Sequence, residues 1–347
     1  MATGAWGTKV AEEPEEVEEE VPVEPSCHTV HVDALVLLKI MRHCPTADPA
    51  LRAGSLLGMD VEGVQQVTNC YPLPAMDDDF TDKDMETYHM NMLRMLREVN
   101  VDNNCVGWYQ TTQLGSFFNQ TFIETQYAYQ LSLGQDAVVL IYDPMQTSKS
   151  SVWLKAFRLT PAFMKMKKLG RDAFGAAAVA QEKLTPADIL EEVPVKLRAS
   201  PIANCLLADM GKERAAAPSS TDFDRLWLST DPYLEKNLEY MCTWADELGA
   251  EMHRLQSHGR YAYRQKQEQA RWLAKRTEEN KLREEAGEEA LPTEDPTNPI
   301  FKHYPEPSRL ESLMISKQIG HYCQQINSFA GMSFSKLFLA SSLRTEE

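Results

Sequence analysis

The sequence lacks the cysteine spacing of a disulfide framework or a structural zinc site. Its 347 residues contain seven cysteines, an odd number, and no Cys-x-x-Cys pair. Disulfide-stapled domains and structural zinc sites usually show even numbers or such pairs. The sequence therefore predicts reduced thiols in a reducing compartment.

Long apolar runs are also missing. No stretch approaches the roughly 18 apolar residues of a membrane span, and the N-terminus has no apolar signal-peptide core. We therefore expect a soluble, cytoplasmic protein that does not contact membranes.

The sequence also lacks an excess of positive charge. Its formal net charge is -16, which argues against binding nucleic acid through the whole surface. Residues 1–25 contain eight Glu, one Lys and three Pro, with few large apolar side chains. This composition predicts a disordered acidic tail, with an acidic interaction arm as the functional alternative.

Strand-like and helix-like segments are mixed between residues 26 and 200, which predicts one α+β domain: a mixed β-sheet flanked by helices. The expected strands are 29–32, 53–59, 64–70, 105–111, 137–143 and 152–159, and the expected helices are 34–43, 83–99 and 121–133. The helix over 34–43 is apolar on nearly every side, so it should be covered by its own sheet and by a second layer or a partner. Residues 171–185 are interpreted as an exposed insertion, and the domain is expected to end near Val195.

One strand carries the most informative motif. Residues 106–113 read Val-Gly-Trp-Tyr-Gln-Thr-Thr-Gln, followed by Ile123-Glu124-Thr125-Gln126 and the strand-like segment 137–144. This arrangement resembles an MPN domain. In catalytic members of that family, Gly-Trp-Tyr precedes His-x-His, seven further residues and Ser-x-x-Asp, which hold zinc and orient its water. Here Gln110 and Thr112 stand at the histidine positions, Gln120 at the serine position and Ile123 at the aspartate position.

These substitutions remove the expected zinc ligands. Catalytic zinc needs about three imidazole, thiolate or carboxylate ligands, and an amide or a hydroxyl is a poor substitute. Glu124 lies one residue beyond the aspartate position and would be a lone carboxylate, and Leu51 stands where the family has its general base. We therefore predict no enzyme activity, no catalytic or metal-binding residues and no cofactor. An isopeptidase-type hydrolase with an unrecognised site is the alternative.

Several further segments extend the resemblance along the chain: 67–72, 96–102, 159–161 and 318–323. With them, the sequence from about His28 to Leu343 resembles the h subunits of eukaryotic translation initiation factor 3. Non-catalytic MPN subunits of the proteasome lid or signalosome are the alternative within the family. The resemblance implies a scaffold subunit that contributes to 40S ribosome binding, mRNA recruitment and translation initiation. Its implied partners are the other initiation factor 3 subunits, namely the MPN-type f subunit and PCI-domain subunits, and, through the complex, the small ribosomal subunit.

The remainder of the chain is predicted to serve association. It divides into a helical extension over 201–285, a Pro-rich linker over 286–309 and a C-terminal bundle helix over 310–347. Apolar residues recur at steps of four and three in two seams, the first over 234–255 and the second over 315–329. The predicted partner-interface residues are Leu238, Met241, Leu248, Met252, Ile315, Ile319, Tyr322, Ile326 and Phe329.

The two seams could pair with each other as a hairpin or join helices of other subunits, and the resemblance favours the second arrangement. We then expect the MPN domain to fold without residues 310–347. Substitutions at Gln318 and Gln325, one position off the second seam, are expected to be nearly silent.

A basic segment lies between the seams. Residues 254–283 contain nine Lys or Arg and three acidic residues, interleaved with Tyr261, Tyr263 and Trp272. This local excess of positive charge is compatible with weak RNA contact through phosphates. A solvated helix with i,i+4 ion pairs is the alternative.

Overall fold

The structure is a computed structural model that describes residues 27–44, 51–74, 82–147, 152–170, 174–214, 233–286, 292, 299–301 and 306–344. The predicted acidic tail and most of the predicted Pro-rich linker lie outside the described residues.

The centre of the fold is one mixed sheet with the strand order β7-β6-β5-β4-β2-β3-β1-β8. Its strands are β1 (Thr29–Asp33), β2 (Ala53–Val61), β3 (Val64–Pro72), β4 (Cys105–Thr111), β5 (Val138–Tyr142), β6 (Leu154–Leu159), β7 (Leu190–Val193) and β8 (Val195–Arg198). β1 runs parallel to β3 and β8, and β4 runs parallel to β5, while the other neighbours are antiparallel. The predicted α+β fold is confirmed.

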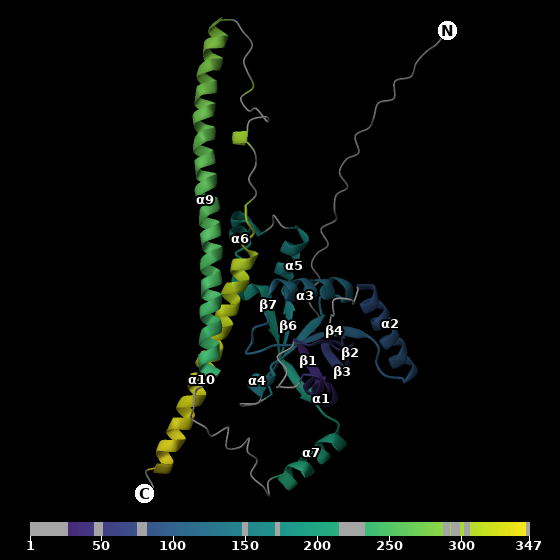
Figure 1. The fold of residues 1–347 in the computed structure, drawn as a ribbon. Helices are drawn as coiled ribbons and strands as arrows, with labels where there is room; N and C mark the ends of the chain where they lie inside the picture. The colour runs from purple at the N-terminus through teal and green to yellow at the C-terminus, as the bar shows by residue number, and fades with distance from the viewer. Residues whose placement is uncertain are drawn as a thin grey trace, which may run out of the picture.

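Helices accompany the sheet and extend beyond it (Figure 1). They are α1 (Ala34–His43), α2 (Asp82–Glu98), α3 (Gln120–Leu133), α4 (Pro144–Thr147), α5 (Pro161–Lys168), α6 (Ala176–Gln181), α7 (Pro201–Arg214), α9 (Tyr233–Ala286) and α10 (Leu310–Arg344), with 3-10 turns η2 (Pro186–Ile189) and η3 (Pro299–Phe301).

The sheet carries a separate apolar core on each face. Successive side chains of a strand point to opposite faces, and every residue of β5 is buried. Val139 and Ile141 belong to the core shared with α3, α5 and α10. Val138 and Leu140 belong to the core under α1. This burial on both faces explains why β5 reads as a continuous apolar run.

Helix α1 is covered on one side only. It has the predicted bounds, and Val36, Leu37 and Ile40 are buried against the sheet. Its outer residues Leu35 and Leu38 are 54% and 60% exposed. Among the described residues, no second layer covers the helix as its sequence had suggested.

One expectation about the end of the domain is wrong. The 171–185 segment contains α6, and its flanking residues Phe174 and Leu184 are buried in the core with α3 and α5. The last strand of the sheet, β8, pairs with β1 from Val195 to Arg198 and lies within the predicted domain bounds of 26–200. β8 is short and mostly exposed, so its sequence has little of the apolar alternation that identifies a strand.

The C-terminal helices form an antiparallel pair. Tyr240 of α9 stacks on Tyr322 of α10 with ring centroids 6.1 Å apart, and Arg254 lies 3.2 Å from Glu311. The first half of α9 therefore runs beside α10, which itself lies against the sheet domain (Figure 1). With 54 residues, α9 is about 80 Å long at 1.5 Å per residue, and its second half projects away from the sheet.

Candidate functional site

The motif strand β4 is fixed by three packing roles. A Cβ at Gly107 would collide with the carbonyl oxygen of Val138 in β5, so the close approach of the two strands requires glycine. The indole of Trp108 donates a 2.8 Å hydrogen bond to Gln126 of α3. On the opposite face, the hydroxyl of Tyr109 lies 2.9 Å from His43 Nδ1 of α1. The Gly-Trp-Tyr motif thus joins both cores.

The positions that the resemblance to catalytic MPN domains predicts as zinc-ligand positions hold side chains with no ionic character. Gln110 is half-buried in β4, and Thr112 is fully buried, with its amide donating to Tyr142. Ile123 has no exposed surface and packs in the same core as Trp108. Glu124 points to the exposed side of α3, where it accepts a 2.7 Å hydrogen bond from Gln120. The site presents an amide, a hydroxyl and an alkyl group.

The loop that follows β4 contains two residues with positive φ angles and is held by hydrogen bonds. Leu114 and Gly115 both adopt positive φ angles, 53° and 77°. The amide of Gly115 donates a 3.0 Å hydrogen bond to the buried carboxylate of Asp143, which also accepts from the amides of Met145 and Gln146. Burial raises the pKa of Asp143 to about 6, against the lowering effect of these hydrogen bonds. Asp143 therefore holds the loop as an anion at neutral pH.

Helix α10 covers this loop with polar side chains. Gln318 Nε2 donates a 2.8 Å hydrogen bond to the carbonyl oxygen of Gly115, and Gln325 Nε2 lies 2.8 Å from His321 Nε2. A Cβ at Gly115 would lie 2.8 Å from His321 Nε2 and even closer to Gln325. The imidazole of His321 also contacts the ring of Phe117, with centroids 5.6 Å apart. We call Gly115, Gln318, His321 and Gln325 the loop clamp.

Burial dominates the electrostatics of the loop clamp. The pKa of His321 is lowered to about 4, first by burial and then by the charges of Lys155 and Lys317. The imidazole is therefore neutral at physiological pH and acts as a packed, uncharged ring. Gln318 has no exposed surface, and Gln325 is also buried.

Helix α10 also completes the core of the sheet domain. Leu310 and Met314 belong to the same apolar cluster as Phe163 and Phe174. The amide of Arg309, just before the helix, donates a 3.0 Å hydrogen bond to the carbonyl of Phe174. The first half of α10 is therefore part of the domain.

These contacts correct two sequence expectations. Gln318 and Gln325 were expected to be silent, but both are buried and both take part in the loop clamp. Residues 310–347 were expected to be dispensable for folding, although Leu310 and Met314 lie in the core. A heptad pattern reports only that a helix has an apolar side. It does not report which surface covers that side.

The predicted interface residues are divided between buried and accessible positions. In α10, Ile315 and Tyr322 are buried within the chain, and Ile319, Ile326 and Phe329 are half-buried. In α9, Leu238 and Met252 are 40% and 56% exposed, while Met241 and Leu248 are half-buried. The second seam is thus partly used inside the molecule, as the hairpin alternative had it, and the first seam remains largely open.

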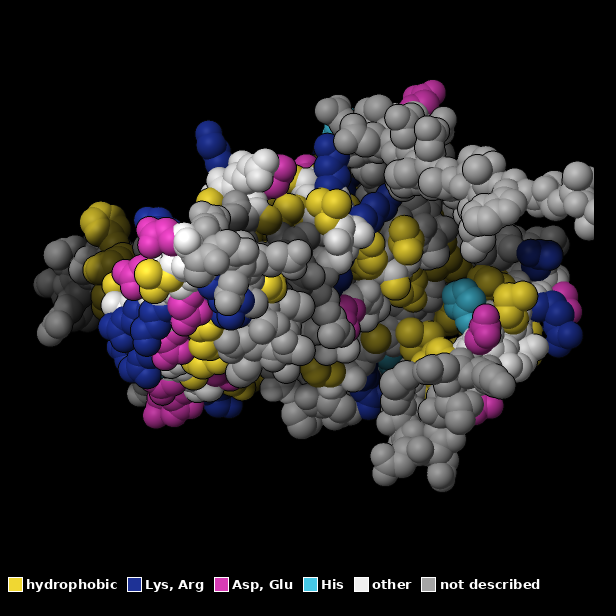
Figure 2. Space-filling model, turned by 90° about the horizontal axis from the view of Figure 1, so that it is seen from above, with side chains coloured by type: hydrophobic (Ala, Val, Ile, Leu, Met, Phe, Trp, Pro, Cys, Tyr) yellow, Lys and Arg dark blue, Asp and Glu magenta, His cyan; other side chains and the backbone are white. Residues whose placement is uncertain are grey.

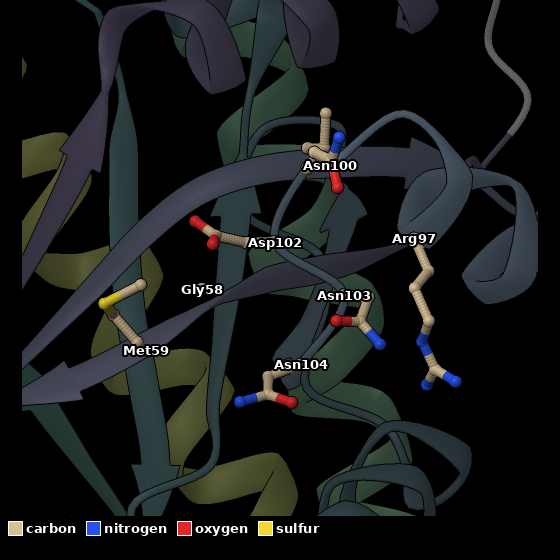
Figure 3. A pocket seen from close by; sticks show the side chains of 8 residues that line it. Gly58, Met59, Arg97, Asn100, Asp102, Asn103 and Asn104 are labelled. Carbon is tan, nitrogen blue, oxygen red and sulfur yellow. The ribbon is translucent and has the colours of Figure 1, made fainter.

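Two hollows lie near these elements. One encloses about 350 Å³ where α9, α10 and the start of α3 meet, with Trp244 and Met314 in its wall and Glu247, Glu251 and Glu311 around it. The other encloses about 290 Å³ between β2 and the loop before β4. Figure 3 shows Arg97, Asn103 and Asn104 around this second hollow. Its Asp102 accepts a 2.6 Å hydrogen bond from Thr68, so this acid is engaged in holding the loop.

Comparison with known proteins identifies the family. The profile for the JAB1/Mov34/MPN/PAD-1 ubiquitin protease family matches residues 25–133, and the profile for the C-terminal region of eIF3h matches residues 147–347. The chain is 42% identical over 322 residues to the H subunit of eukaryotic translation initiation factor 3 from Arabidopsis thaliana, covering 92% of this chain and 94% of that protein. The corresponding H subunits of Nematostella vectensis and Dictyostelium discoideum are 39% and 38% identical over 92% and 91% of this chain, and over 95% and 94% of their own lengths.

The chain belongs to the H-subunit family of eukaryotic translation initiation factor 3. The sheet domain is accordingly an MPN domain, and α10 lies within the C-terminal region that characterises this family. This confirms the resemblance recognised in the sequence, and it separates the chain from the MPN subunits of the proteasome lid and signalosome. None of the described helices combines the length and apolar character of a membrane-spanning helix.

Sequence reasoning missed the loop clamp. The one local signal was the run Gln113-Leu114-Gly115-Ser116, which marks a turn after β4. The partners of that turn lie about 200 residues away in α10, and no periodic pattern connects them. The segment 318–323 contributed to the family resemblance, but its sequence suggested no physical role. In the structure, its Gln318 and His321 belong to the loop clamp.

Proposed function

We propose that this protein is a non-catalytic scaffold subunit of the cytoplasmic translation initiation factor 3 complex. The observation that carries the proposal is the conversion of the zinc-binding positions of an MPN domain into packing positions, in a chain of the H-subunit family. Ile123 lies inside an apolar core, and Thr112 is fully buried. A zinc ion could gain no ligand at either place.

The covered loop supports the same conclusion. In this chain the residues immediately after the former ligand strand are held from one side by Asp143 and from the other by α10. A substrate that approached this loop would have to displace a helix whose first half is buried in the domain. We infer that the MPN fold has here become a platform for association.

Four accessible apolar surfaces fit an association role. They lie on the outer face of α1, on α7, along the first seam of α9 and at the end of α10. On α7, the exposed residues Ile202, Leu206 and Met210 share one side of the helix. At the end of α10, Phe334 and Phe338 are 69% and 75% exposed. Contiguous exposed apolar surface of this kind usually marks a protein interface.

We assign these surfaces to different partners. The MPN domain, with the open face of α1, is proposed to pair with the MPN-type f subunit. The first seam of α9 and the end of α10 are proposed to enter a helical bundle with PCI-domain subunits. The assignment follows from shape, since a sheet domain offers a broad face to a similar domain and long helices offer seams to other helices.

The projecting half of α9 is proposed to contact RNA weakly when the complex binds the small ribosomal subunit. Seven of the nine cationic side chains in 254–283 are exposed. Seen from above, Lys and Arg side chains are interspersed with Asp and Glu over the end of α9 (Figure 2). Arg276 is engaged by the ring of Trp272, 4.9 Å away, and by Glu279. The mixed charge favours a salt-sensitive, auxiliary contact.

Co-purification tests the scaffold proposal. The tagged chain should recover the factor 3 complex from cells, and Leu238→Glu combined with Met252→Glu should weaken that recovery. Leu169→Glu serves as the control, because Leu169 is 77% exposed but lies at the end of α5, away from both seams. Recovery of the complex by the seam variant at the wild-type level would exclude the first seam as an interface.

A second measurement tests the absence of catalysis. The purified protein should leave ubiquitin chains uncut, with or without added zinc. Cleavage that disappears when Gln110 or Thr112 is changed would overturn the non-catalytic proposal.

A further inference from the structure

Three metal-ligand side chains from distant parts of the chain meet at one end of the sheet, away from β4's former ligand positions. Cys27 precedes β1, Asp60 lies near the end of β2, and Asp136 precedes β5. Their sulfur and carboxylate oxygen atoms all lie within 4.8 Å of one another. Cys27 is buried, Asp136 is half-buried and Asp60 is exposed, so the group can be reached from solvent.

A buried oxygen beside this group lacks a hydrogen-bond donor. Gln65 Nε2 donates to the carbonyl oxygens of Val106 and Asp136, at 3.1 and 3.0 Å, which determines which end of the amide is nitrogen. Gln65 Oε1 has no hydrogen-bond partner among the described residues, although Gln65 is only 4% exposed. Buried acceptors of this kind are rarely left unsatisfied in proteins.

The position of Gln65 places its side-chain amide beside the same group. Asp60 and Gln65 are directly opposite each other in the β2–β3 ladder. Side chains that are opposite in an antiparallel pair project from the same face of the sheet. The bond from Gln65 to the carbonyl of Asp136 places the amide next to the second acid as well.

We propose that Cys27, Asp60, Asp136 and the side-chain oxygen of Gln65 bind one divalent ion, and that this ion is zinc. A thiolate among the ligands disfavours magnesium and calcium, which prefer oxygen. Zinc accepts sulfur at about 2.3 Å and oxygen at about 2.0–2.2 Å in a tetrahedron. These bond lengths require ligand atoms about 3.5 Å apart, so a pair at the 4.8 Å limit would have to close by about 1.3 Å on binding. The Cys27 thiol would release its proton to solvent.

The surroundings suit a bound cation. Asp136 Oδ1 accepts a 2.9 Å hydrogen bond from the amide of Cys27, which orients the carboxylate as outer contacts of metal ligands usually do. The buried guanidinium of Arg158 lies 3.8 Å from the same oxygen. Arg158 also pairs with Glu191, which is exposed to solvent. Two carboxylates and a thiolate carry three negative charges, of which a divalent ion would neutralise two, while Arg158 shares its charge between Asp136 and Glu191.

The proposed ion would act as a structural clip. It would tie the start of β1 to the β2–β3 hairpin and to the turn before β5, three segments that are far apart in the sequence. The sequence pattern of structural zinc sites does not reveal this arrangement, because Cys27, Asp60 and Asp136 are far apart along the chain and Gln65, although close to Asp60, is not a usual zinc ligand.

Metal binding by the reduced full-length protein tests the proposal. Zinc binding is measured by competition with a chromophoric chelator, and cadmium is used as a second probe because its thiolate complexes absorb in the ultraviolet. We expect one zinc per chain and one cadmium-thiolate band. Cys27→Ser should abolish the band, and Asp60→Asn should weaken zinc binding about tenfold or more.

Matched controls separate this site from other thiols and acids. Cys323→Ser removes an exposed thiol on α10, and Glu62→Gln removes an exposed acid two residues from Asp60. Both variants should bind like the wild type, and millimolar magnesium should not displace the zinc. If Cys27→Ser does not fold, Asp60→Asn decides the question, because Asp60 lies on the surface. Unchanged zinc affinity in Asp60→Asn, or loss of the cadmium band in Cys323→Ser instead, would overturn the proposal.

Discussion

Deletion of residues 310–347 should unfold the MPN domain itself. The deletion removes Leu310, Met314, Ile315 and Tyr322, all of which are buried. Burial of a large apolar side chain contributes about 1.5–3 kcal/mol, so the four together contribute about 6–12 kcal/mol. This range is an upper estimate, because the unfolded chain already buries some apolar surface. It is nevertheless comparable to the whole stability of a domain, about 5–15 kcal/mol.

A second truncation provides the matched control. A chain that ends at Gly331 loses the last part of α10, where Met332, Phe334 and Phe338 are 42% to 75% exposed. Little burial is lost, so its free energy of unfolding should stay within about 0.5 kcal/mol of the full chain. The two deletions differ only in whether the buried half of α10 is kept.

Urea denaturation of the three chains, followed by circular dichroism, makes the comparison. The full chain and the chain ending at Gly331 should unfold with the same midpoint and the same slope. The chain ending at Arg309 should show no cooperative transition or a midpoint close to zero denaturant. A cooperative transition with a nearly unchanged midpoint in the chain ending at Arg309 would refute the reasoning, and α10 would then be an appendage of the domain.

Three further predictions concern the same helix. Gly115→Ala should lower the free energy of unfolding by about 1–2 kcal/mol through backbone strain, and by a further amount because the new Cβ displaces Gln325. In urea denaturation, the double variant with Gln325→Ala should lose less stability than the sum of the two single variants. Neutral His321 contributes its full stability above about pH 6.5. This contribution, on the order of 3 kcal/mol, is lost as the pH falls toward the folded pKa of about 4. The difference in free energy of unfolding between the wild type and His321→Gln should therefore become smaller from pH 6.5 to pH 4. Asp143, with its pKa raised to about 6, titrates in both proteins and cancels in this difference, so a constant gap would contradict the prediction. Phe338→Asp should leave the melting temperature of the isolated chain unchanged while it reduces co-purification with the complex, and a lowered melting temperature would instead place Phe338 in an intrachain contact.

The elements of the MPN domain could be predicted because their sequences carry their own signals. The expected helix over 34–43 has the observed bounds, and the strands around Trp108 and Leu140 were recognised from apolar runs bounded by turns. Short-range periodicity is sufficient for such elements. The family could be recognised for a similar reason, because the Gly-Trp-Tyr motif is local.

The contacts of α10 could not be predicted in the same way. Its sequence indicates a helix with an apolar side, and both the hairpin and the intersubunit bundle satisfy that pattern. The choice depends on Leu310 and Met314, which reach the core only because the chain returns from the far end of α9 to the side of the sheet. Gln318 illustrates the same limit, since an amide in a helix is normally taken as solvent-exposed, yet this one binds the carbonyl of Gly115.

The Gly-Trp-Tyr motif of β4 has a physical explanation in the packing of the two cores. Gly107, Trp108 and Tyr109 each have a packing role that does not involve metal: close approach to β5, a hydrogen bond to α3 and contact with His43 of α1. Replacement of any of them would disturb a core whether or not zinc is bound. Gln110 is only half-buried, so an amide there is compatible with the same fold, whereas Thr112 and Ile123 are fully buried. The Gly-Trp-Tyr motif is therefore explained by packing alone, and the loop beyond β4 is covered by the chain's own C-terminal helix, whose Gln318 binds the carbonyl of Gly115.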